Sequence, residues 1–200
     1  MQVKQLDLSN KTVVDVSCGH GASCYFFTKY YQPARFIGVD RCHQSLKIAQ
    51  QKLSSVDKLE LIQADCCRLP FSDNSIDIVI NTEASHCYPD FAAFLNEVTR
   101  ILKPGGYFAW TDLIFMNDKE HLDSLFETCT LNEIYYNEIT DNVLMSLEQD
   151  SERKAAIIQS VTWWARGAIS DFAGMPGTVI YNSFKNGKLQ YWRALMQKPT

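Results

Sequence analysis

Two glycines separated by one residue follow the first β-branched run of this chain. The run Thr12–Val16 carries one acidic residue, Asp15, and is typical of a buried parallel strand. Gly19 and Gly21 have no Cβ, so the backbone there can turn sharply and approach a ligand closely. Apolar residues at helical spacing follow over Ala22–Tyr30, and a helix that begins here would point free N–H groups at that ligand. The loop predicts a nucleotide-binding turn, and an ordinary strand-to-helix turn is the alternative.

A second acidic residue has the spacing expected for a ribose. Asp40 ends the apolar run Phe36–Val39, about 20 residues after the glycine loop, where a carboxylate can accept hydrogen bonds from both ribose hydroxyls. A solvated loop aspartate is the plainer alternative. The third glycine of a Gly-x-Gly-x-x-Gly dinucleotide motif is absent, because Cys24 stands in its place. The pattern therefore indicates a ribose without favouring a dinucleotide.

Alternating strand and helix patterns place these polar residues on one edge of a sheet. Strands are expected at Thr12–Val16, Phe36–Val39, Leu59–Gln63, Ile76–Asn81 and Tyr107–Thr111, and helices at Ala22–Tyr30, Gln44–Leu53 and Asp90–Leu102, the last ended by Pro104-Gly105-Gly106. Such strand–helix–strand units build a parallel sheet with helices on both faces, whose ligands bind beyond the carboxyl ends of the strands. Gly19, Asp40, Asp65, His86 and Asp112 each end or follow a strand, so we expect all five at that edge.

Composition narrows the possible classes of protein. The 200 residues suit a single domain, and the formal net charge of -4 gives no electrostatic reason to expect nucleic acid or an anionic membrane. No apolar run approaches the roughly 18 residues of a membrane span, and the given sequence does not begin with a charged region followed by an apolar stretch, as a signal peptide would. We expect a soluble, cytoplasmic protein with a small-molecule partner and no integral membrane association.

The cysteines predict free thiols. The chain has seven, at positions 18, 24, 42, 66, 67, 87 and 129, an odd number without the pattern of a disulfide framework. Several of them, with His20, His43 and His86, follow predicted strands, so a metal site is conceivable. Because no Cys-x-x-Cys or His-x-x-x-His pair is present, we expect no metal and interpret these residues as lining a crevice.

Four segments resemble class I S-adenosylmethionine-dependent methyltransferases. They are Val13–Gly21, Gly38-Val39-Asp40, Gln63–Phe71, and Ile76–Asn81 continuing through Leu102-Lys103-Pro104-Gly105-Gly106. Together they cover about residues 10–115 in the family's order and spacing. Within that family, Glu83–Pro89 resembles small-molecule O-methyltransferases of natural products, lipids and sugars, near the ubiquinone and sterol enzymes. The resemblance implies a Rossmann-like, doubly wound α/β fold, with a mostly parallel seven-stranded sheet, helices on both faces and an antiparallel last strand.

The resemblance also implies a cofactor and the residues that hold it. S-adenosyl-L-methionine would be the methyl donor and S-adenosyl-L-homocysteine the product. The implied cofactor-binding residues are Asp15, Ser17, Cys18, Gly19 and Gly21 at the methionine end, Asp40 at the ribose, Arg41, Ala64, Asp65 and Cys66 at the adenine, and Asn81. The carboxylate of Asp65 would accept from the adenine amino group, and the Cys66 N–H would meet a ring nitrogen.

A hydroxyl acceptor needs its proton removed, and histidine titrates in the useful range. We expect His86 to be the general base and Asp112 to orient it and stabilise the imidazolium. Some sugar O-methyltransferases of this group carry a histidine and an aspartate at these two places. A loop histidine without a partner is the alternative.

The last third of the chain is harder to interpret. We expect a helix over Lys119–Thr130, a strand over Ile134–Ile139, and a substrate-covering helical insertion at 141–177 within one methyltransferase domain spanning 1–200. Trp163, Trp164, Phe172 and Met175 would line an apolar acceptor pocket or pack in the core. Val179–Lys185 fits a helix or, because Asn186-Gly187 follows, one arm of a hairpin, and the resemblance favours the helix. An antiparallel strand is expected over Gln190–Met196, at or near the sheet edge.

Only about ten residues precede the first strand, where the family usually carries helices that cover the cofactor. This predicts a shortened chain, an open site, or a cover supplied by a partner or by a second copy in a homodimer. N- or C-methylation and a cofactor-binding module without catalysis remain alternatives to the hydroxyl methyltransferase. Cys24 disfavours a dinucleotide oxidoreductase, and the lack of an Asn-Pro-Pro-Tyr-type motif disfavours nucleic-acid methylation.

Overall fold

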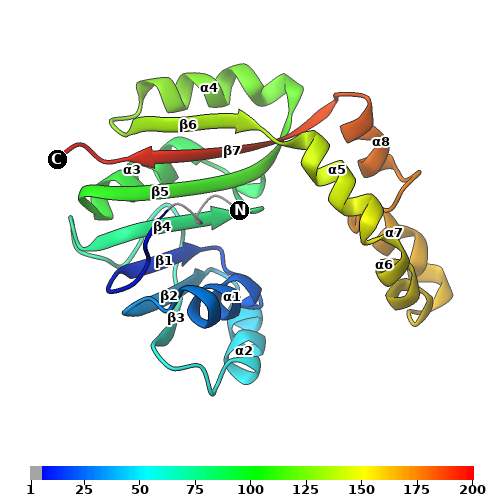
Figure 1. The fold of residues 1–200 in the computed structure, drawn as a ribbon, viewed down its shortest axis with the longest axis horizontal. Helices are drawn as coiled ribbons and strands as arrows, with labels where there is room; N and C mark the ends of the chain where they lie inside the picture. The colour runs from blue at the N-terminus through cyan, green and yellow to red at the C-terminus, as the bar shows by residue number, and fades with distance from the viewer. Residues whose placement is uncertain (1–5) are drawn as a thin grey trace. The chain divides into compact units, whose positions relative to one another are not determined.

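The computed structural model describes residues 6–200, and its central feature is a seven-stranded sheet (Figure 1). The strand order is β3-β2-β1-β4-β5-β7-β6. The strands are β1 (Thr12–Val16), β2 (Arg35–Asp40), β3 (Leu59–Gln63), β4 (Ile76–Thr82), β5 (Leu102–Phe115), β6 (Asn132–Glu138) and β7 (Leu189–Gln197). The helices are α1 (Ala22–Tyr31), α2 (His43–Lys52), α3 (Phe91–Ile101), α4 (Lys119–Thr128), α5 (Thr140–Gln149), α6 (Ser151–Gln159), α7 (Arg166–Phe172) and α8 (Val179–Lys185).

The sheet is mostly parallel, as expected. β1 pairs in parallel with β2 and with β4, and further parallel pairs join β2 to β3 and β4 to β5. β7 runs against its neighbours and lies next to the edge strand β6 (Figure 1). The chain leaves β1 toward β2 and β3 and later returns to β4 on the other side of β1. This reversal of strand order is the switch point at which such sheets bind their ligands.

The β-branched run of β1 is buried because the strand has neighbours on both sides. Val13 and Val14 are fully buried, and Asp15 is 2% exposed. α3 turns its apolar stripe to the core through Phe94 and Val98, which are likewise fully buried. The sequence pattern therefore predicts the core of this part of the molecule correctly, and the structure confirms the expected Rossmann-like fold.

The expected strand over Tyr107–Thr111 is too short. β5 runs from Leu102 to Phe115, so Pro104-Gly105-Gly106 belongs to the strand and Asp112 lies inside it instead of at its end. The Gly105 N–H donates to the Lys198 carbonyl at 2.9 Å, and the Lys198 N–H donates to the Gly106 carbonyl at 2.9 Å. Gly105 has φ +76° and the register with β4 shifts nearby. The glycines therefore form an irregular stretch near the start of β5 and not a turn. Other element bounds differ from expectation by a residue or two.

A second compact unit comprises residues 113–123 and 137–192. Its helices α5, α6, α7 and α8 follow one another along the chain, and the segment 141–177 is helical as expected. Val179–Lys185 is a helix and not a hairpin arm, because the Asn186 N–H continues the helical pattern to the Asn182 carbonyl at 2.9 Å. None of the helices within residues 6–200 has the length and apolar character that a membrane span requires.

Three large aromatic side chains of the segment 141–177 do not pack in the core of this unit. Trp163 is 79% exposed, Trp164 is 72% exposed and Phe172 is 91% exposed. The core-packing alternative is therefore wrong for these three. The buried apolar cluster of the unit is built instead around Phe184, Leu189 and Tyr191, with partly buried residues of α5 packed against it.

Candidate active site

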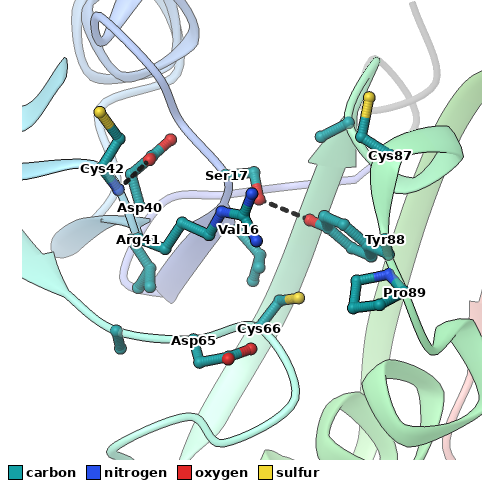
Figure 2. Close-up of a pocket in the computed structure, with 13 residues that line it drawn as sticks. Val16, Ser17, Asp40, Arg41, Cys42, Asp65, Cys66, Cys87, Tyr88 and Pro89 are labelled. Carbon is teal, nitrogen blue, oxygen red and sulfur yellow. Dashed lines mark hydrogen bonds between the residues drawn. The ribbon is translucent and has the colours of Figure 1, made fainter.

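A cavity of about 280 Å³ lies beyond the carboxyl ends of β1, β2, β3 and β4 (Figure 2). Its lining comes from the segments that follow these four strands. The residues are Val16, Ser17, Val39, Asp40, Arg41, Cys42, Ala64, Asp65, Cys66, Ala84, Cys87, Tyr88 and Pro89. The cavity therefore sits at the switch point, and it brings together six of the residues predicted for the cofactor: Ser17, Asp40, Arg41, Ala64, Asp65 and Cys66. Of the other predicted cofactor residues, Asp15, Cys18, Gly19, Gly21 and Asn81 do not line it.

The glycine loop is held in a left-handed backbone. Ser17 has φ +64°, Gly19 has φ +53° and Gly21 has φ +79°. A Cβ on Gly21 would lie 2.6 Å from Leu53 Cδ1, because the end of α2 packs against the loop there, whereas a Cβ on Gly19 would meet nothing within 4 Å. Gly21 is thus required for packing, and Gly19 leaves the backbone open to a ligand.

Asp40 ties the loops after β1 and β2 together. Its Oδ2 accepts from the Gly19 N–H and its Oδ1 from the Cys42 N–H, both at 2.8 Å. These two bonds fix the carboxylate in the wall of the cavity, and each oxygen retains a lone pair for another donor. A pair of ribose hydroxyls needs such an acceptor.

The loop after β3 is a hydrogen-bonded turn. The Arg68 N–H donates to the Asp65 carbonyl at 3.0 Å, and Asp65 Oδ1 accepts from the Cys67 N–H at 2.9 Å. Cys66 is half-buried, and burial raises the pKa of its thiol to about 12. Asp65 and Cys66 of this turn line the cavity.

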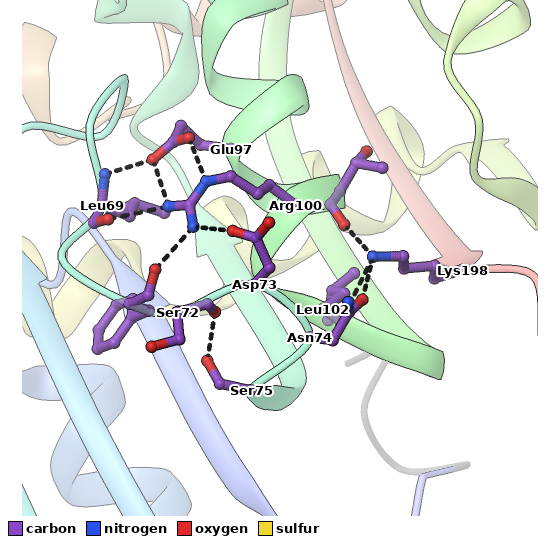
Figure 3. Close-up of polar contacts among 11 residues, drawn as sticks. Leu69, Ser72, Asp73, Asn74, Ser75, Glu97, Arg100, Leu102 and Lys198 are labelled. Atoms are coloured by element: carbon purple, nitrogen blue, oxygen red, sulfur yellow. Dashed lines mark hydrogen bonds and ion pairs between the residues drawn. The ribbon is translucent and has the colours of Figure 1, made fainter.

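Arg100 on α3 fastens the chain that leaves this turn (Figure 3). Its guanidinium donates to the carbonyls of Leu69 and Phe71, at 3.0 and 2.7 Å, and to the carboxylates of Glu97 and Asp73. Glu97 in turn accepts from the Leu69 N–H at 2.6 Å. Charge-assisted bonds of this kind are among the strong ones, so the segment that carries the Leu69-Pro70-Phe71 signature is held rigidly.

Tyr88 joins β1 to β4 and was not predicted as a site residue. Its hydroxyl lies 2.6 Å from Ser17 Oγ and accepts from Asn81 Nδ2 at 2.8 Å, and its ring packs edge-on against Phe94. Burial raises the pKa of Tyr88, so the phenol stays protonated. The segment Glu83–Pro89 carried a family resemblance, but only the fold reveals that its tyrosine reaches the glycine loop.

Asn81 is fully buried at the end of β4. Its Nδ2 also donates to the Val16 carbonyl at 2.9 Å, whereas its Oδ1 is buried without a hydrogen-bond partner among residues 6–200. A buried unpaired acceptor costs about 1–3 kcal/mol and calls for an explanation. A donor supplied by a ligand would satisfy it.

Asp15 sits behind the loop and not in the cavity wall. It accepts hydrogen bonds from the Ser23 hydroxyl and the Cys24 thiol. Burial raises the pKa of Asp15 to about 7, so the carboxyl group is partly protonated at neutral pH. The sequence predicts a buried strand here, but it does not predict the raised pKa of this carboxyl group.

His86 and Asp112 meet at the carboxyl side of β4 and β5. His86 Nδ1 lies 2.7 Å from Asp112 Oδ1, and 29% of the histidine side chain is exposed. Asp112 is 1% exposed, and its Oδ2 accepts from the N–H groups of Ala84 and His86 and from the Ser85 hydroxyl, at 3.1, 3.0 and 2.6 Å. The bond to Asp112 raises the pKa of His86 above its ordinary value, against the opposing effect of burial.

A further support lies behind this pair. Trp110 Nε1 donates to Ser85 Oγ at 2.8 Å, and Ser85 Oγ donates to Asp112. The carboxylate is therefore fixed both by backbone donors and by a buried indole–hydroxyl chain. Neither Trp110 nor Ser85 carries a sequence signal for this role, because only strand pairing brings them to Asp112. His86 itself does not line the cavity, although its neighbour Cys87 does.

A Rossmann-like sheet with a ribose-type acid and a glycine loop at its switch point defines a nucleoside-cofactor protein. The chain matches the model of the methyltransferase domain family over residues 14–110. It is 35% identical over 188 residues to a phthiotriol/phenolphthiotriol dimycocerosates methyltransferase of Mycobacterium leprae, covering 94% of this chain and 69% of that protein. It is 31% identical over 157 residues to a fatty-acid O-methyltransferase of Mycolicibacterium smegmatis, covering 78% of this chain and 57% of that protein.

Solved structures show the same fold. Phosphoethanolamine N-methyltransferase 2 of Haemonchus contortus, in complex with S-adenosyl-L-methionine, aligns with a TM-score of 0.83 at 16% identity over 96% of this chain and 49% of that one. Geranyl diphosphate C-methyltransferase of Streptomyces coelicolor A3(2) aligns with a TM-score of 0.70 at 17% identity over 96% of this chain and 76% of that one. The chain belongs to the class I S-adenosylmethionine-dependent methyltransferases, and S-adenosyl-L-methionine is its cofactor.

The donors and acceptors of the site fit this cofactor. Asp40 and Asp65 supply acceptors for hydroxyl and amino groups, and the backbone at Gly19 is open to close approach. Among residues 6–200 no group donates to Asn81 Oδ1, and the charged ammonium of a methionine moiety is such a donor. The prediction of the cofactor from the sequence is therefore confirmed at the level of family and chemistry.

Proposed function

We propose that this methyltransferase transfers its methyl group to a hydroxyl of a small, lipid-like molecule, with His86 as general base. The observation that carries the proposal is the 2.7 Å contact between His86 Nδ1 and Asp112 Oδ1. Asp112 accepts a hydrogen bond from the Nδ1–H group, so Nε2 is left as the acceptor for the proton of the attacking hydroxyl. The same carboxylate stabilises the imidazolium once that proton has moved.

The cofactor supplies a methyl group on a positively charged sulfur, so the protein has mainly to position the partners. Asp40 holds the ribose, and Asp65 with the Cys66 N–H holds the adenine, while Arg41 and Ala64 complete that wall. Ser17, Cys18, Gly19, Gly21 and Asn81 surround the methionine end. Asp15 acts behind them, because a positive group that comes near would lower the raised pKa of its buried carboxyl and favour the ionised form.

The acceptor is proposed to be apolar over most of its length. Two relatives act, by name, on phthiotriol or phenolphthiotriol dimycocerosates and on a fatty acid. In this chain Trp163, Trp164 and Phe172 expose large apolar side chains in the segment 141–177, which suits an apolar ligand. A cytoplasmic location and a cover from a partner or second copy remain predictions.

The experiment is an acceptor series with His86→Ala and, as the matched control, His121→Ala on α4. A long-chain alcohol or phenol needs a base, whereas a fatty-acid carboxylate is already ionised and an amine has a free lone pair once its ammonium proton has passed to solvent. We expect His86→Ala to lower methyl transfer to the alcohol by on the order of 10²- to 10⁴-fold while S-adenosyl-L-homocysteine binding is unchanged. Near-normal turnover of His86→Ala on every accepted substrate would contradict the hydroxyl assignment and favour N- or C-methylation.

The alternative of a binding module without catalysis has its own outcome. Calorimetric titration that detects both the cofactor and its demethylated product, and loses both in Asp40→Ala, confirms the nucleoside site. If binding is normal and no acceptor of any class is methylated, the binding-module alternative holds.

A further inference from the structure

Three metal-ligating side chains converge on the turn after β3. Asp65, Cys66 and Cys67 each offer one ligand atom, and these atoms all lie within 4.8 Å of one another. The two thiols occupy the central positions of a turn closed by the bond from Arg68 N to the Asp65 carbonyl, so they project from adjacent residues of a fixed backbone. The two cysteines are adjacent in the sequence and therefore do not form the Cys-x-x-Cys pair that is typical of metal sites.

The distance between the two sulfurs fits a shared metal. Cys66 Sγ and Cys67 Sγ lie 3.9 Å apart. Two thiolates at about 2.3 Å from a tetrahedral zinc ion lie about 3.8 Å from each other, so the pair already spans one edge of that tetrahedron. A disulfide fits less well, because consecutive Cα atoms are about 3.8 Å apart and disulfides usually need 4.4 Å or more.

We propose that Asp65, Cys66 and Cys67 form a site for a thiophilic divalent cation such as Zn²⁺. Two sulfurs and one carboxylate oxygen form a ligand set that suits zinc better than calcium or magnesium, because those two metals take oxygen ligands. Three protein ligands leave the fourth tetrahedral position for water or an added ligand. On binding, the two thiol protons pass to solvent, and no oxidant or reductant takes part.

The metal site overlaps the adenine wall of the cofactor cavity. Asp65 and Cys66 line the cavity, whereas Cys67 does not. A cation that engages the carboxylate and rotates the Cys66 side chain toward it withdraws the acceptor proposed for the adenine amino group. The site therefore makes cofactor binding sensitive to thiophilic metals, a consequence that rests on the proposed position of the adenine.

The test uses the full chain, reduced and freed of metal, with Cd²⁺ as a spectroscopic probe. Titration is expected to give a thiolate-to-cadmium charge-transfer band in the ultraviolet that saturates at one equivalent, with Zn²⁺ displacing the probe. Cys67→Ser is expected to weaken Cd²⁺ binding at least 10-fold. Cys129→Ser, whose half-buried thiol bonds to the Phe126 carbonyl, is the matched control and is expected to bind like the parent. Thermal unfolding checks that both variants are folded, and Cys67→Ala replaces Cys67→Ser if the latter is not.

A second titration measures S-adenosyl-L-homocysteine binding with and without saturating Zn²⁺. We expect Zn²⁺ to weaken it at least 10-fold in the parent and to leave it unchanged in Cys67→Ser. Absence of the cadmium band, or an unchanged Cd²⁺ affinity in Cys67→Ser, overturns the metal site. A normal band without an effect of Zn²⁺ on S-adenosyl-L-homocysteine binding overturns the proposed competition between metal and cofactor. A normal band in a chain that binds no S-adenosyl-L-homocysteine overturns the proposed cofactor contacts but not the metal site.

Discussion

The strand residues Asp40 and Asp112 and the helical segment 141–177 hold their candidate functional side chains in opposite ways. Asp40 and Asp112 are each fixed by two or more hydrogen bonds from different parts of the chain. Trp163 and Phe172, in contrast, expose 79% and 91% of their surface. Groups that must act at a defined distance are fixed by several hydrogen bonds each, whereas the aromatic groups that would recognise an apolar acceptor are free to change conformation. Breaking the first arrangement should cost turnover, and changing the second should alter only which acceptor is used.

Asp112→Asn is expected to have the largest effect. The amide loses the charge that stabilises the imidazolium and favours the wrong histidine tautomer, and it accepts less strongly from Ala84, Ser85 and His86. We expect kcat to fall on the order of 10³-fold and the free energy of unfolding to fall by about 1–3 kcal/mol. Single-turnover methyl transfer and urea denaturation measure the two effects. A variant with unchanged kcat would show that the pair is structural.

The pH dependence tests the same pair without a substitution at His86. The pKa of His86 is raised by its bond to Asp112, and the base is active only when neutral. The ascending limb of kcat/KM should therefore have its midpoint above the ordinary histidine value of about 6.5 and should move down in Asp112→Asn. A raised folded-state pKa also contributes stability that is present below about pH 6.5 and is lost as pH rises through the folded value. A limb centred at or below 6.5 in the parent would contradict the assignment.

Tyr88→Phe is expected to have an intermediate effect. It removes the hydroxyl between Ser17 and Asn81 but keeps the ring that packs on Phe94. One or two hydrogen bonds of ordinary strength are worth about 1–2 kcal/mol, so we expect S-adenosyl-L-homocysteine to bind on the order of 10-fold more weakly. Calorimetry measures the change, and Tyr30→Phe, an exposed ring on α1, is the control.

Replacing both tryptophans, as Trp163→Ala with Trp164→Ala, is expected to have the smallest effect on the protein itself. Because both side chains are exposed, the free energy of unfolding should change by less than about 0.5 kcal/mol per site. KM should rise several-fold for long-chain acceptors and less for short ones, with S-adenosyl-L-homocysteine affinity unchanged. Equal losses for all chain lengths, or a large loss of stability, would remove the contrast between the two regions.

Local patterns in the sequence correctly predict the part of the fold in which each element depends only on residues close to it in the chain. The β-branched run of β1, the glycine loop and Asp40 depend on neighbours within about 20 residues of the chain, and all three lie where expected. The features that the sequence did not predict depend on contacts between residues far apart in the chain. β5 extends through Pro104 because the chain near Lys198 pairs with it, and Tyr88 enters the site because β4 lies beside β1. The pKa of Asp15 depends on burial and on the hydrogen bonds from Ser23 and Cys24, and only the fold gives their combined effect.

Gly38, in the middle of β2, lies against the side chains of Cys18, Cys24 and Leu61. A Cβ at this position would lie 2.8 Å from Cys24 Sγ and 2.9 Å from both Cys18 Sγ and Leu61 Cδ2, so no larger residue fits without a shift of its neighbours. The two thiols therefore fill the space that a side chain at position 38 would occupy. Across relatives, a side chain at the place of Gly38 should appear together with a smaller residue at the place of Cys18 or Cys24. Such correlated change would be the evolutionary trace of a contact that carries no chemistry of its own.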